Sequence, residues 1–442
     1  MSDVADPTLP GMPAATPPDA RRGAPRYETA NRTQIELTPT DLEALLPPGH
    51  MARLVWRFVE GLDLSALAGP VRAREGHAGR PAIDPQILIA LWLYATIDGV
   101  GSAREVDRLG RAHDAYRWLR GGVSVSYHTL SDFRVQHHAV LTDLLTQSIA
   151  TLRHRGIVTL ARVAHDGTRI RASAGAGSFR RKATLQACLQ AAQQLVARTQ
   201  RQGDGGRTRE EAAQARAAAG RLARVAEALA DLPAVAAAKA RTQASQPTAR
   251  RRPREARVST TDPDARVMKL SDGGYRPAYN VQFATDVDSD VIVGVAVTNQ
   301  GSDQAALVPM LTQVATRAGH PATWLADGGY VSHPNIDACA QRGVTLLAPV
   351  RRQRGAAAPE PAQPSDSPAV TAWRQRMQTD EAKQTYRQRG ATAERLHGDL
   401  RTHRPLTHLG VRGLAKVHTW VVWIALAHNL VRTMGIVPHL MT

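Results

Sequence analysis

Residues 180–257 differ sharply in composition from the rest of the chain and restrict the folds that it can adopt. They contain 17 Lys or Arg against 6 Asp or Glu, are rich in Ala, Gln and Arg, and have no aromatic residue. Their apolar spacing predicts helices over 183–200 and 210–232, with a hairpin as one arrangement, before a basic segment at 250–254. We interpret this stretch as a helical insertion that interrupts another domain.

The segments on either side of the insertion have different periodicities. Residues 38–152 have helical spacing, in which Asp84-Pro85 starts an apolar helix and Ser102 and Ser126 cap two others. Helices joined by short glycine turns are compatible with helix-turn-helix DNA recognition and equally with a helical bundle that packs or dimerises. Beyond the insertion, alternating residues predict a β-hairpin over 278–286 and 291–297.

Strands and helices are expected to alternate in the rest of the chain. Two strands, 158–166 and 168–173, are expected around an Asp166-Gly167 turn. After the hairpin we expect a helix over 303–318, a strand over 323–326, a helix over 335–342, a strand over 344–349, a linker over 351–370 and helices over 380–434. The fold class is therefore α+β or α/β, with a mixed sheet flanked by helices and an all-α region before it.

The charge and the cysteine content limit which partners and which cellular compartment are expected for the protein. Lys and Arg number 56 against 39 Asp and Glu, which favours a polyanionic partner, although ribosomal and membrane-surface proteins are basic too. Cys188 and Cys339 form no zinc-binding spacing and no disulfide framework, which fits a reducing cytoplasm. The start is acidic and Pro-rich, and the apolar stretch 420–430 is too short for a bilayer, so we expect no signal peptide and no membrane partner.

Three separate segments each offer one carboxylate. Asp166 and Asp327 each follow an apolar run and precede glycine, and Glu394 lies in a basic amphipathic segment. Two Asp and one Glu make an all-oxygen site for a hard cation such as Mg²⁺. The competing interpretations are ordinary turn aspartates and a solvent-facing helical Glu, with Glu381 and Asp399 as substitutes for Glu394.

One near-copy of the second acidic segment tests how specific that pattern is. Residues 271–275 repeat the Asp-Gly-Gly-Tyr sequence of residues 327–330, with the aspartate at Asp272. No apolar run precedes Asp272, so we assign it to a turn.

Several blocks, in this order, resemble the DDE transposases of bacterial insertion sequences. They are Gly79-Arg80-Pro81-Ala82-Ile83-Asp84-Pro85, Tyr279-Asn280-Val281-Gln282, Val411-Arg412-Gly413-Leu414-Ala415-Lys416-Val417 and Ala427-His428-Asn429-Leu430, together with the three acidic segments. The resemblance covers about 26–434. It implies a ribonuclease-H-like catalytic domain in which Asp166, Asp327 and Glu394 are catalytic and bind Mg²⁺ or Mn²⁺ as a pair of ions.

The resemblance also implies roles for basic residues around Glu394. The related signature places a Tyr, an Arg, a Glu and a Lys on one helix, and the corresponding residues here are Tyr386, Arg389, Glu394 and Arg401. Four residues separate Arg389 from Glu394 where three are expected, and Arg401 replaces the Lys. These side chains, with Arg395 and the insertion's Arg251, Arg252 and Arg254, are expected to contact DNA.

The resemblance leads to an expected organisation and activity. We expect a disordered tail over 1–25, a helical DNA-binding or assembly region over 26–152, catalytic segments over 153–179 and 258–442, and the basic insertion over 180–257. The protein would act in the cytoplasm on the nucleoid, as a homodimer or larger oligomer on double-stranded DNA. It would bind its element's terminal inverted repeats and catalyse strand cleavage and transfer into target DNA. A non-catalytic, transposase-derived DNA-binding protein and a metal-dependent nuclease without strand transfer are the alternatives.

Overall fold

A computed structural model describes residues 41–69, 81–201, 208–244, 255–351, 362–407 and 409–436, with the isolated positions 30, 32, 33 and 39. The chain divides into Met1–Asp41 and Leu42–Thr442, and every element described below belongs to the second unit. The tail expected over 1–25, the residues Gly79 and Arg80, and the basic residues Arg251, Arg252 and Arg254 lie outside the described residues.

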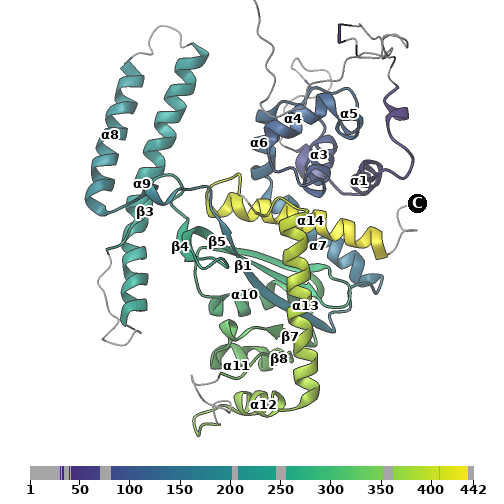
Figure 1. Cartoon of the computed structure of the whole chain (residues 1–442), viewed down its shortest axis with the longest axis vertical. Helices are drawn as coiled ribbons and strands as arrows, with labels where there is room; N and C mark the ends of the chain where they lie inside the picture. The colour runs from purple at the N-terminus through teal and green to yellow at the C-terminus, as the bar shows by residue number, and fades with distance from the viewer. Residues whose placement is uncertain are drawn as a thin grey trace, which may run out of the picture. The chain divides into compact units, whose positions relative to one another are not determined.

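The first part of the chain is helical, as its periodicity predicts (Figure 1). Its helices are α1 (Met51–Glu60), α2 (Ser65–Ala68), α3 (Pro85–Ile97), α4 (Ala103–Ala112), α5 (Asp114–Arg120), α6 (Tyr127–Gln136) and α7 (His138–His154). The predicted caps are confirmed, because Asp84, Ser102 and Ser126 each accept a hydrogen bond from a backbone N–H in the first turn of α3, α4 and α6. Every residue of α3 from Ile87 to Thr96 is buried, so this helix forms the centre of the helical region.

The sheet that follows is mixed and has the strand order of a ribonuclease-H-like fold. Its strands are β1 (Arg162–Arg171), β4 (Arg266–Lys269), β5 (Tyr275–Asp286), β6 (Ile292–Thr298), β7 (Thr323–Ala326) and β8 (Thr345–Leu347). β5 pairs antiparallel with β1, β4 and β6, whereas β1, β7 and β8 run parallel. The predicted hairpin, the predicted strands over 323–326 and 344–349 and the predicted mixed sheet are therefore confirmed, with β1 at the centre of the sheet.

The prediction of a turn at Asp166-Gly167 is wrong, because both residues lie in the middle of β1. Asp166 pairs with Phe283 and Gly167 with Gln282, within an uninterrupted register from Val163 to Arg171. An Asp-Gly pair forms a hairpin turn only where the residues after it fold back and pair with the strand before it. Here the partner strand β5 comes from beyond the insertion, and its pairing continues across the glycine.

Helices cover the sheet and its parallel edge. They are α10 (Leu307–Ala318), α11 (His333–Gln341), α12 (Pro368–Arg376), α13 (Asp380–Thr402) and α14 (Leu414–Ile436). α13 packs against β1 (Figure 1), and α10 packs on β6. α12 begins inside the stretch 351–370 that was expected to be a linker, with Ser367 as its cap and Pro368 in its first turn. Its buried Trp373 donates a hydrogen bond to the carbonyl oxygen of Ala348, which explains why a helix forms there.

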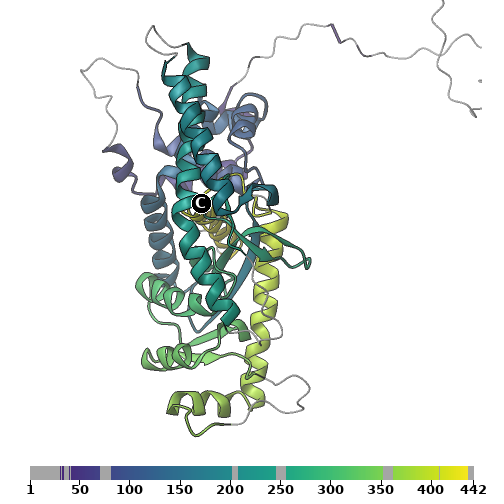
Figure 2. The ribbon, with the colours of Figure 1, turned by 90° about the vertical axis from the view of Figure 1, so that its left-hand side faces the viewer.

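The insertion is helical, as predicted, its two helices have the hairpin arrangement that the sequence left open, and it has a small core of its own. α8 (Lys182–Arg201) and α9 (Arg209–Ala244) lie side by side, and the short strands β2 (Phe179–Arg180) and β3 (Val258–Ser259) pair at its base (Figures 1 and 2). Buried residues in it are Leu185, Ala228, Leu232, Val235 and Val258. α9 continues to Ala244, past Pro233, where the sequence predicted an end at residue 232. Burial of Val235 on the far side of the proline helps to explain the continuation.

α14 connects the helical region to the sheet. It packs on α3, α6, α7 and β6, and the ring of Trp420 meets Trp92 edge to face at 5.6 Å. Asn429 both accepts a hydrogen bond from the N–H of Ile292 and donates one to its carbonyl oxygen, each at 2.8 Å. The helix is long and apolar enough to cross a membrane, but 72% of its apolar window is buried inside the protein. It is therefore a core helix of this unit.

Candidate active site

The structure places Asp166 and Asp327 at corresponding positions of neighbouring strands. β1 and β7 are parallel, and their last paired residues are His165 and Ala326, so the two aspartates follow directly on each strand. Asp327 leaves the sheet as the cap of a 3₁₀ turn, η5 (Gly328–Tyr330), where one carboxylate oxygen accepts the N–H of Gly329 at 2.7 Å. The sheet itself therefore brings together two of the three predicted acidic residues.

The environment of Asp166 disfavours its negative charge. Its side chain is only 23% exposed, and burial raises the pKa of its carboxyl group to about 6. Arg389 opposes this effect, with Nη1 3.3 Å from the carboxylate, while Asp327 and Asp303 raise the pKa further. A half-buried carboxylate repelled by two others is the setting in which a bound cation is stabilising.

One face of α13 lies against Asp166. Arg389 and His397, two turns apart, both approach its carboxylate, with Nδ1 of His397 at 4.0 Å. Arg401, one turn further, donates a hydrogen bond to the hydroxyl of Thr168, two residues along β1 from Asp166. Burial, assisted by Arg401 and Arg389, lowers the pKa of His397 to about 4, so this imidazole is neutral at pH 7. The helix thus lines the site with two fixed positive charges.

Glu394 lies on the same helix but is exposed to solvent. Arg401 follows it by seven residues, which is two helical turns, so Glu394 projects from the edge of α13 that borders the site. Within the described ranges, no three His, Cys, Asp or Glu side chains are gathered closely enough to hold a metal ion. The structure therefore brings Asp166 and Asp327 together and leaves Glu394 at the rim.

The other acidic residues considered from the sequence have local roles. Asp399 shares a 2.9 Å contact with His428 and lies 4.0 Å from Arg404, and Glu381 is exposed near the start of α13. Asp272 lies in a turn, as predicted, and accepts the N–H of Gly274 at 2.9 Å, but a short strand, β4, does precede it and this turn joins β4 to β5.

The predicted DNA-contacting residues on α13 divide into two groups. The guanidinium of Arg389 is 5.9 Å from the ring of half-buried Tyr386, and its Nε and Nη1 atoms are buried without a hydrogen bond. By contrast, Arg395 turns away from the aspartates and binds Asp290 at 2.6 Å. Tyr386, Arg389 and Arg401 therefore border the site, and Arg395 contacts the turn between β5 and β6.

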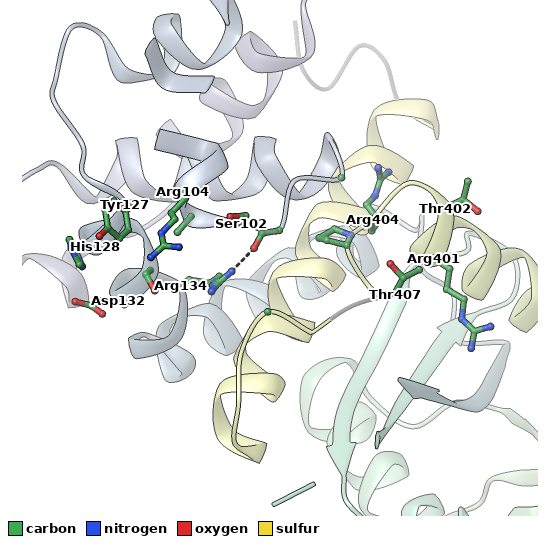
Figure 3. Close-up of a pocket in the computed structure, with 16 residues that line it drawn as sticks. Ser102, Arg104, Tyr127, His128, Asp132, Arg134, Arg401, Thr402, Arg404 and Thr407 are labelled. Carbon is green, nitrogen blue, oxygen red and sulfur yellow. Dashed lines mark hydrogen bonds between the residues drawn. The ribbon is translucent and has the colours of Figure 1, made fainter. Parts of the chain in front are cut away.

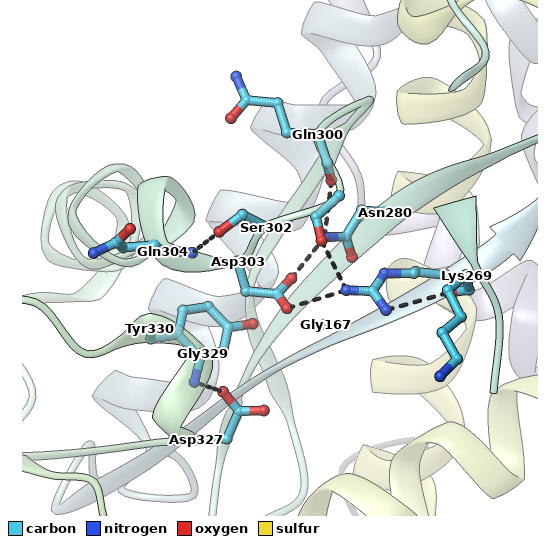
Figure 4. Close-up of polar contacts among 12 residues, drawn as sticks. Gly167, Lys269, Asn280, Gln300, Ser302, Asp303, Gln304, Asp327, Gly329 and Tyr330 are labelled. Atoms are coloured by element: carbon cyan, nitrogen blue, oxygen red, sulfur yellow. Dashed lines mark hydrogen bonds and ion pairs between the residues drawn. The ribbon is translucent and has the colours of Figure 1, made fainter. Parts of the chain in front are cut away.

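Sequence reasoning missed a further polar group directly beside the two aspartates. Asp303 accepts a hydrogen bond from the side-chain amide of Asn280 at 2.6 Å (Figure 4) and one from that of Gln282 at 2.8 Å. The hydroxyl of Tyr330 donates to Gln282. The block 279–282 is one of the motifs that carry the resemblance, but nothing in its local sequence indicates that its amides contact Asp303 or that Asp303 lies near Asp166.

A basic cavity of about 640 Å³ lies between the helical region and the segment that joins α13 to α14. Four arginines line it, Arg104, Arg134, Arg401 and Arg404 (Figure 3). Burial lowers the pKa of Arg134 to about 10, and this side chain donates to the carbonyl oxygen of Gly101. Tyr127 lies 5.2 Å from the guanidinium of Arg104. The cavity thus presents positive charge and an aromatic ring beside Arg401, which reaches the candidate active site.

Comparison with known proteins connects this geometry to two family models. A model described as a transposase DDE domain matches residues 255–430, and a second, described as a transposase domain, matches residues 40–136. Together they cover more than half of the chain. The first match contains Asp327, Asp303 and Glu394, but not Asp166, which precedes the insertion. The chain matches no curated protein.

Proposed function

Because the chain belongs to the DDE transposases of insertion sequences, we propose that it binds the terminal inverted repeats of its own element and catalyses DNA strand cleavage and strand transfer. The observation that carries the proposal is the pair Asp166 and Asp327 on adjacent parallel strands, beside the guanidinium of Arg389, whose Nη1 lies 3.3 Å from the Asp166 carboxylate. Carboxylates alone would repel a phosphodiester, whereas carboxylates that hold cations and lie next to an arginine attract it.

The residues present fit the divalent metal ions that this family generally uses. Asp166 and Asp327 are oxygen donors of the kind that Mg²⁺ and Mn²⁺ prefer, and the raised pKa of Asp166 shows that its site disfavours uncompensated charge. We propose that Asp166, Asp327 and Glu394 hold a pair of such ions, with Glu394 turning inward from the rim. When bound, the ions neutralise charge on the phosphodiester and lower the pKa of a bound water.

The chain's own residues position the DNA for two successive reactions. In the first, water attacks the phosphodiester at the element end, the P–O bond to the 3′ oxygen breaks, and a 3′-hydroxyl is released. In the second, that hydroxyl attacks a phosphodiester of target DNA and displaces its 3′ oxygen. Arg389 and Arg401, held on α13 against β1, would bind phosphate oxygens in both steps. His397 is neutral at pH 7, so it adds no positive charge beside Asp166 that would compete with a bound cation.

DNA binding outside the catalytic centre would involve two basic regions. The cavity lined by Arg104, Arg134, Arg401 and Arg404 leads from the helical region toward the catalytic sheet. The insertion carries a surplus of 11 positive charges, as 17 Lys and Arg against 6 Asp and Glu, and would add salt-sensitive affinity with little sequence preference. Because both element ends must be brought together, we propose that the active form on DNA is at least a dimer.

The test is cleavage of DNA that carries the ends flanking the gene, in Mg²⁺ and in Mn²⁺. Three proteins are compared: the native chain, Asp327→Asn, and Asp272→Asn as a matched control in the near-copy of the motif. We expect the native chain and Asp272→Asn to cut at the element boundary and produce joined donor–target molecules, and Asp327→Asn to bind DNA without cutting it.

The other outcomes identify the alternatives. Cleavage without joined products indicates a nuclease. Tight binding without cleavage by the native chain indicates a DNA-binding protein derived from a transposase. Cleavage that survives Asp327→Asn means that the active site lies on other carboxylates.

A further inference from the structure

The block Tyr279-Asn280-Val281-Gln282 is not explained by the catalytic role of the acidic residues. It lies in β5, where side chains alternate between the two faces of the sheet. Asn280 and Gln282 are 1% and 0% exposed, and they share the sheet face on which Gly167 of β1 lies opposite Gln282. Two fully buried amides require partners, because an unsatisfied buried polar group costs about 1 to 3 kcal/mol.

Asp303 supplies those partners. One of its carboxylate oxygens, Oδ1, accepts from Asn280 at 2.6 Å and from Gln282 at 2.8 Å, and Gln282 also donates to Asn280 at 3.0 Å. Its other oxygen, Oδ2, lies 3.8 Å from the guanidinium of Arg169, a β1 residue on the same face. Asp303 thus contacts side chains of both β5 and β1.

Gly167 makes room for this carboxylate, and Gly329, near a second candidate catalytic residue, lies within van der Waals distance of it. A Cβ atom on Gly167, which follows Asp166, would be 2.9 Å from Oδ1 of Asp303 and would also collide with Gln282. A Cβ atom on Gly329, whose N–H binds Asp327, would lie 3.7 Å from Oδ2 of Asp303. Asp303 therefore sits between the backbone of β1 at Asp166 and the turn that holds Asp327.

Gln282 links the same group to that turn. Its side-chain oxygen accepts the hydroxyl of Tyr330, a fully buried residue of η5. Asn335 then holds the carbonyl oxygen of Tyr330 at 2.7 Å from the start of α11. A continuous set of hydrogen bonds thus runs from β5 through Asp303 and Gln282 to the turn after Asp327.

We propose that Asp303 is a positioning residue which, with Asn280 and Gln282, fixes the turn carrying Asp327 against the strand carrying Asp166. The proposal rests on the proposed function, because it concerns the spacing of the two carboxylates that would bind the cations. Asp303 is not itself assigned as a ligand, since Oδ1 already accepts two amide hydrogen bonds and Oδ2 faces Arg169. Residues that orient metal ligands typically change metal affinity or activity by about 10- to 100-fold when they are replaced.

The test uses three variants of the full chain and one control. Asp303→Asn keeps the shape and removes the charge, Tyr330→Phe removes only the hydroxyl that binds Gln282, and Gly167→Ala displaces Asp303 without removing a polar group. Asp272→Asn is the control, because that aspartate lies in an exposed turn. Amide hydrogen exchange is measured without metal, Mn²⁺ binding is measured by electron paramagnetic resonance, and DNA affinity is measured separately.

We expect Asp303→Asn and Gly167→Ala to speed exchange across residues 327–331 and to raise the Mn²⁺ concentration for half-saturation by about tenfold or more, with DNA affinity unchanged. Tyr330→Phe should show a smaller change of the same kind, and Asp272→Asn none. Unchanged exchange and Mn²⁺ affinity in Asp303→Asn would overturn the proposal. So would faster exchange throughout the protein, which would show a general structural role. If the native chain binds no Mn²⁺, the proposed function fails, while exchange in the turn still decides whether Asp303 positions it.

Discussion

Replacing Asp166 by Asn should stabilise the metal-free protein, although the same change should abolish any catalysis that depends on its charge. Burial raises the pKa of Asp166 to about 6 from an ordinary value of 3.8, against the opposing effect of Arg389. A group whose pKa is raised by folding favours the folded state when it is protonated. That contribution is complete below pH 3.8 and is lost as the pH rises through 6. Asn remains neutral at every pH, so it avoids the loss.

The magnitude follows from the two pKa values. Each tenfold change in proton affinity corresponds to about 1.4 kcal/mol, so the step from 3.8 to about 6 amounts to about 3 kcal/mol of unfolding free energy above pH 6. The side chain is 23% exposed, so solvent screens only part of this energy. The pKa of about 6 already includes the opposing effect of Arg389, whose Nη1 is 3.3 Å from the carboxylate, so only this screening reduces the net gain, to between about 1 and 3 kcal/mol.

Urea unfolding between pH 4 and pH 8, with a metal chelator present, measures this difference. The native chain and Asp166→Asn should have equal stability near pH 4, and the variant should become more stable as the pH rises to 8. Asp399→Asn is a control in which the change in stability at high pH should have the opposite sign. Although burial raises the pKa of Asp399, its hydrogen bond with His428 and the charge of Arg404 lower the pKa overall. This control should therefore be less stable than the native chain at pH 8. An Asp166→Asn protein that is no more stable at pH 8 than at pH 4, relative to the native chain, would refute the reasoning.

Three further substitutions, the last with a control, test packing, backbone hydrogen bonding at β6 and DNA contact. Gly294→Ala should destabilise the fold by about 1 to 3 kcal/mol in urea unfolding, because the new Cβ would lie 2.5 Å from the sulfur of Met310 in α10. An unchanged urea midpoint would contradict this packing. Asn429→Leu leaves the buried N–H and carbonyl of Ile292 without their partners. It should lower the free energy of unfolding by about 1 to 3 kcal/mol in the same assay. A stability equal to that of the native chain would show that water replaces the amide. Arg401→Gln should reduce the slope of log affinity against log salt for DNA by about one, while Arg395→Gln, whose parent side chain is bound to Asp290, should leave the slope unchanged.

Much of the fold could be predicted because its signals are local. Asp84, Ser102 and Ser126 cap helices where the sequence places them, and residues 278–297 form the predicted hairpin. The prediction of a turn at Asp166-Gly167 is wrong for a non-local reason. The strand partner that keeps this segment extended lies beyond the insertion. The glycine is required because a Cβ atom at position 167 would collide with the side chains of Gln282 in β5 and Asp303.

The candidate site was only partly accessible from the sequence. The strand positions of Asp166 and Asp327 make their proximity clear once β1 and β7 are paired, but the catalytic roles of these residues and of Glu394 remain predictions. Asp303 was missed because its importance depends on three elements that meet only in the folded protein. A lone aspartate ahead of a helix has the appearance of a cap, and no spacing distinguishes it from one.

The central position of β1 has a consequence for the order in which the protein can be assembled during synthesis. Arg171 of β1 pairs with Ala278 of β5, which is 107 residues further along the chain. At a translation rate of about 5 to 20 residues per second, the strand waits about 5 to 20 s for that partner. Meanwhile α8 and α9 can close on each other through local contacts. A nascent chain that has not reached Ala278 therefore presents its future central strand with both edges unpaired, which is the state most open to association with other chains.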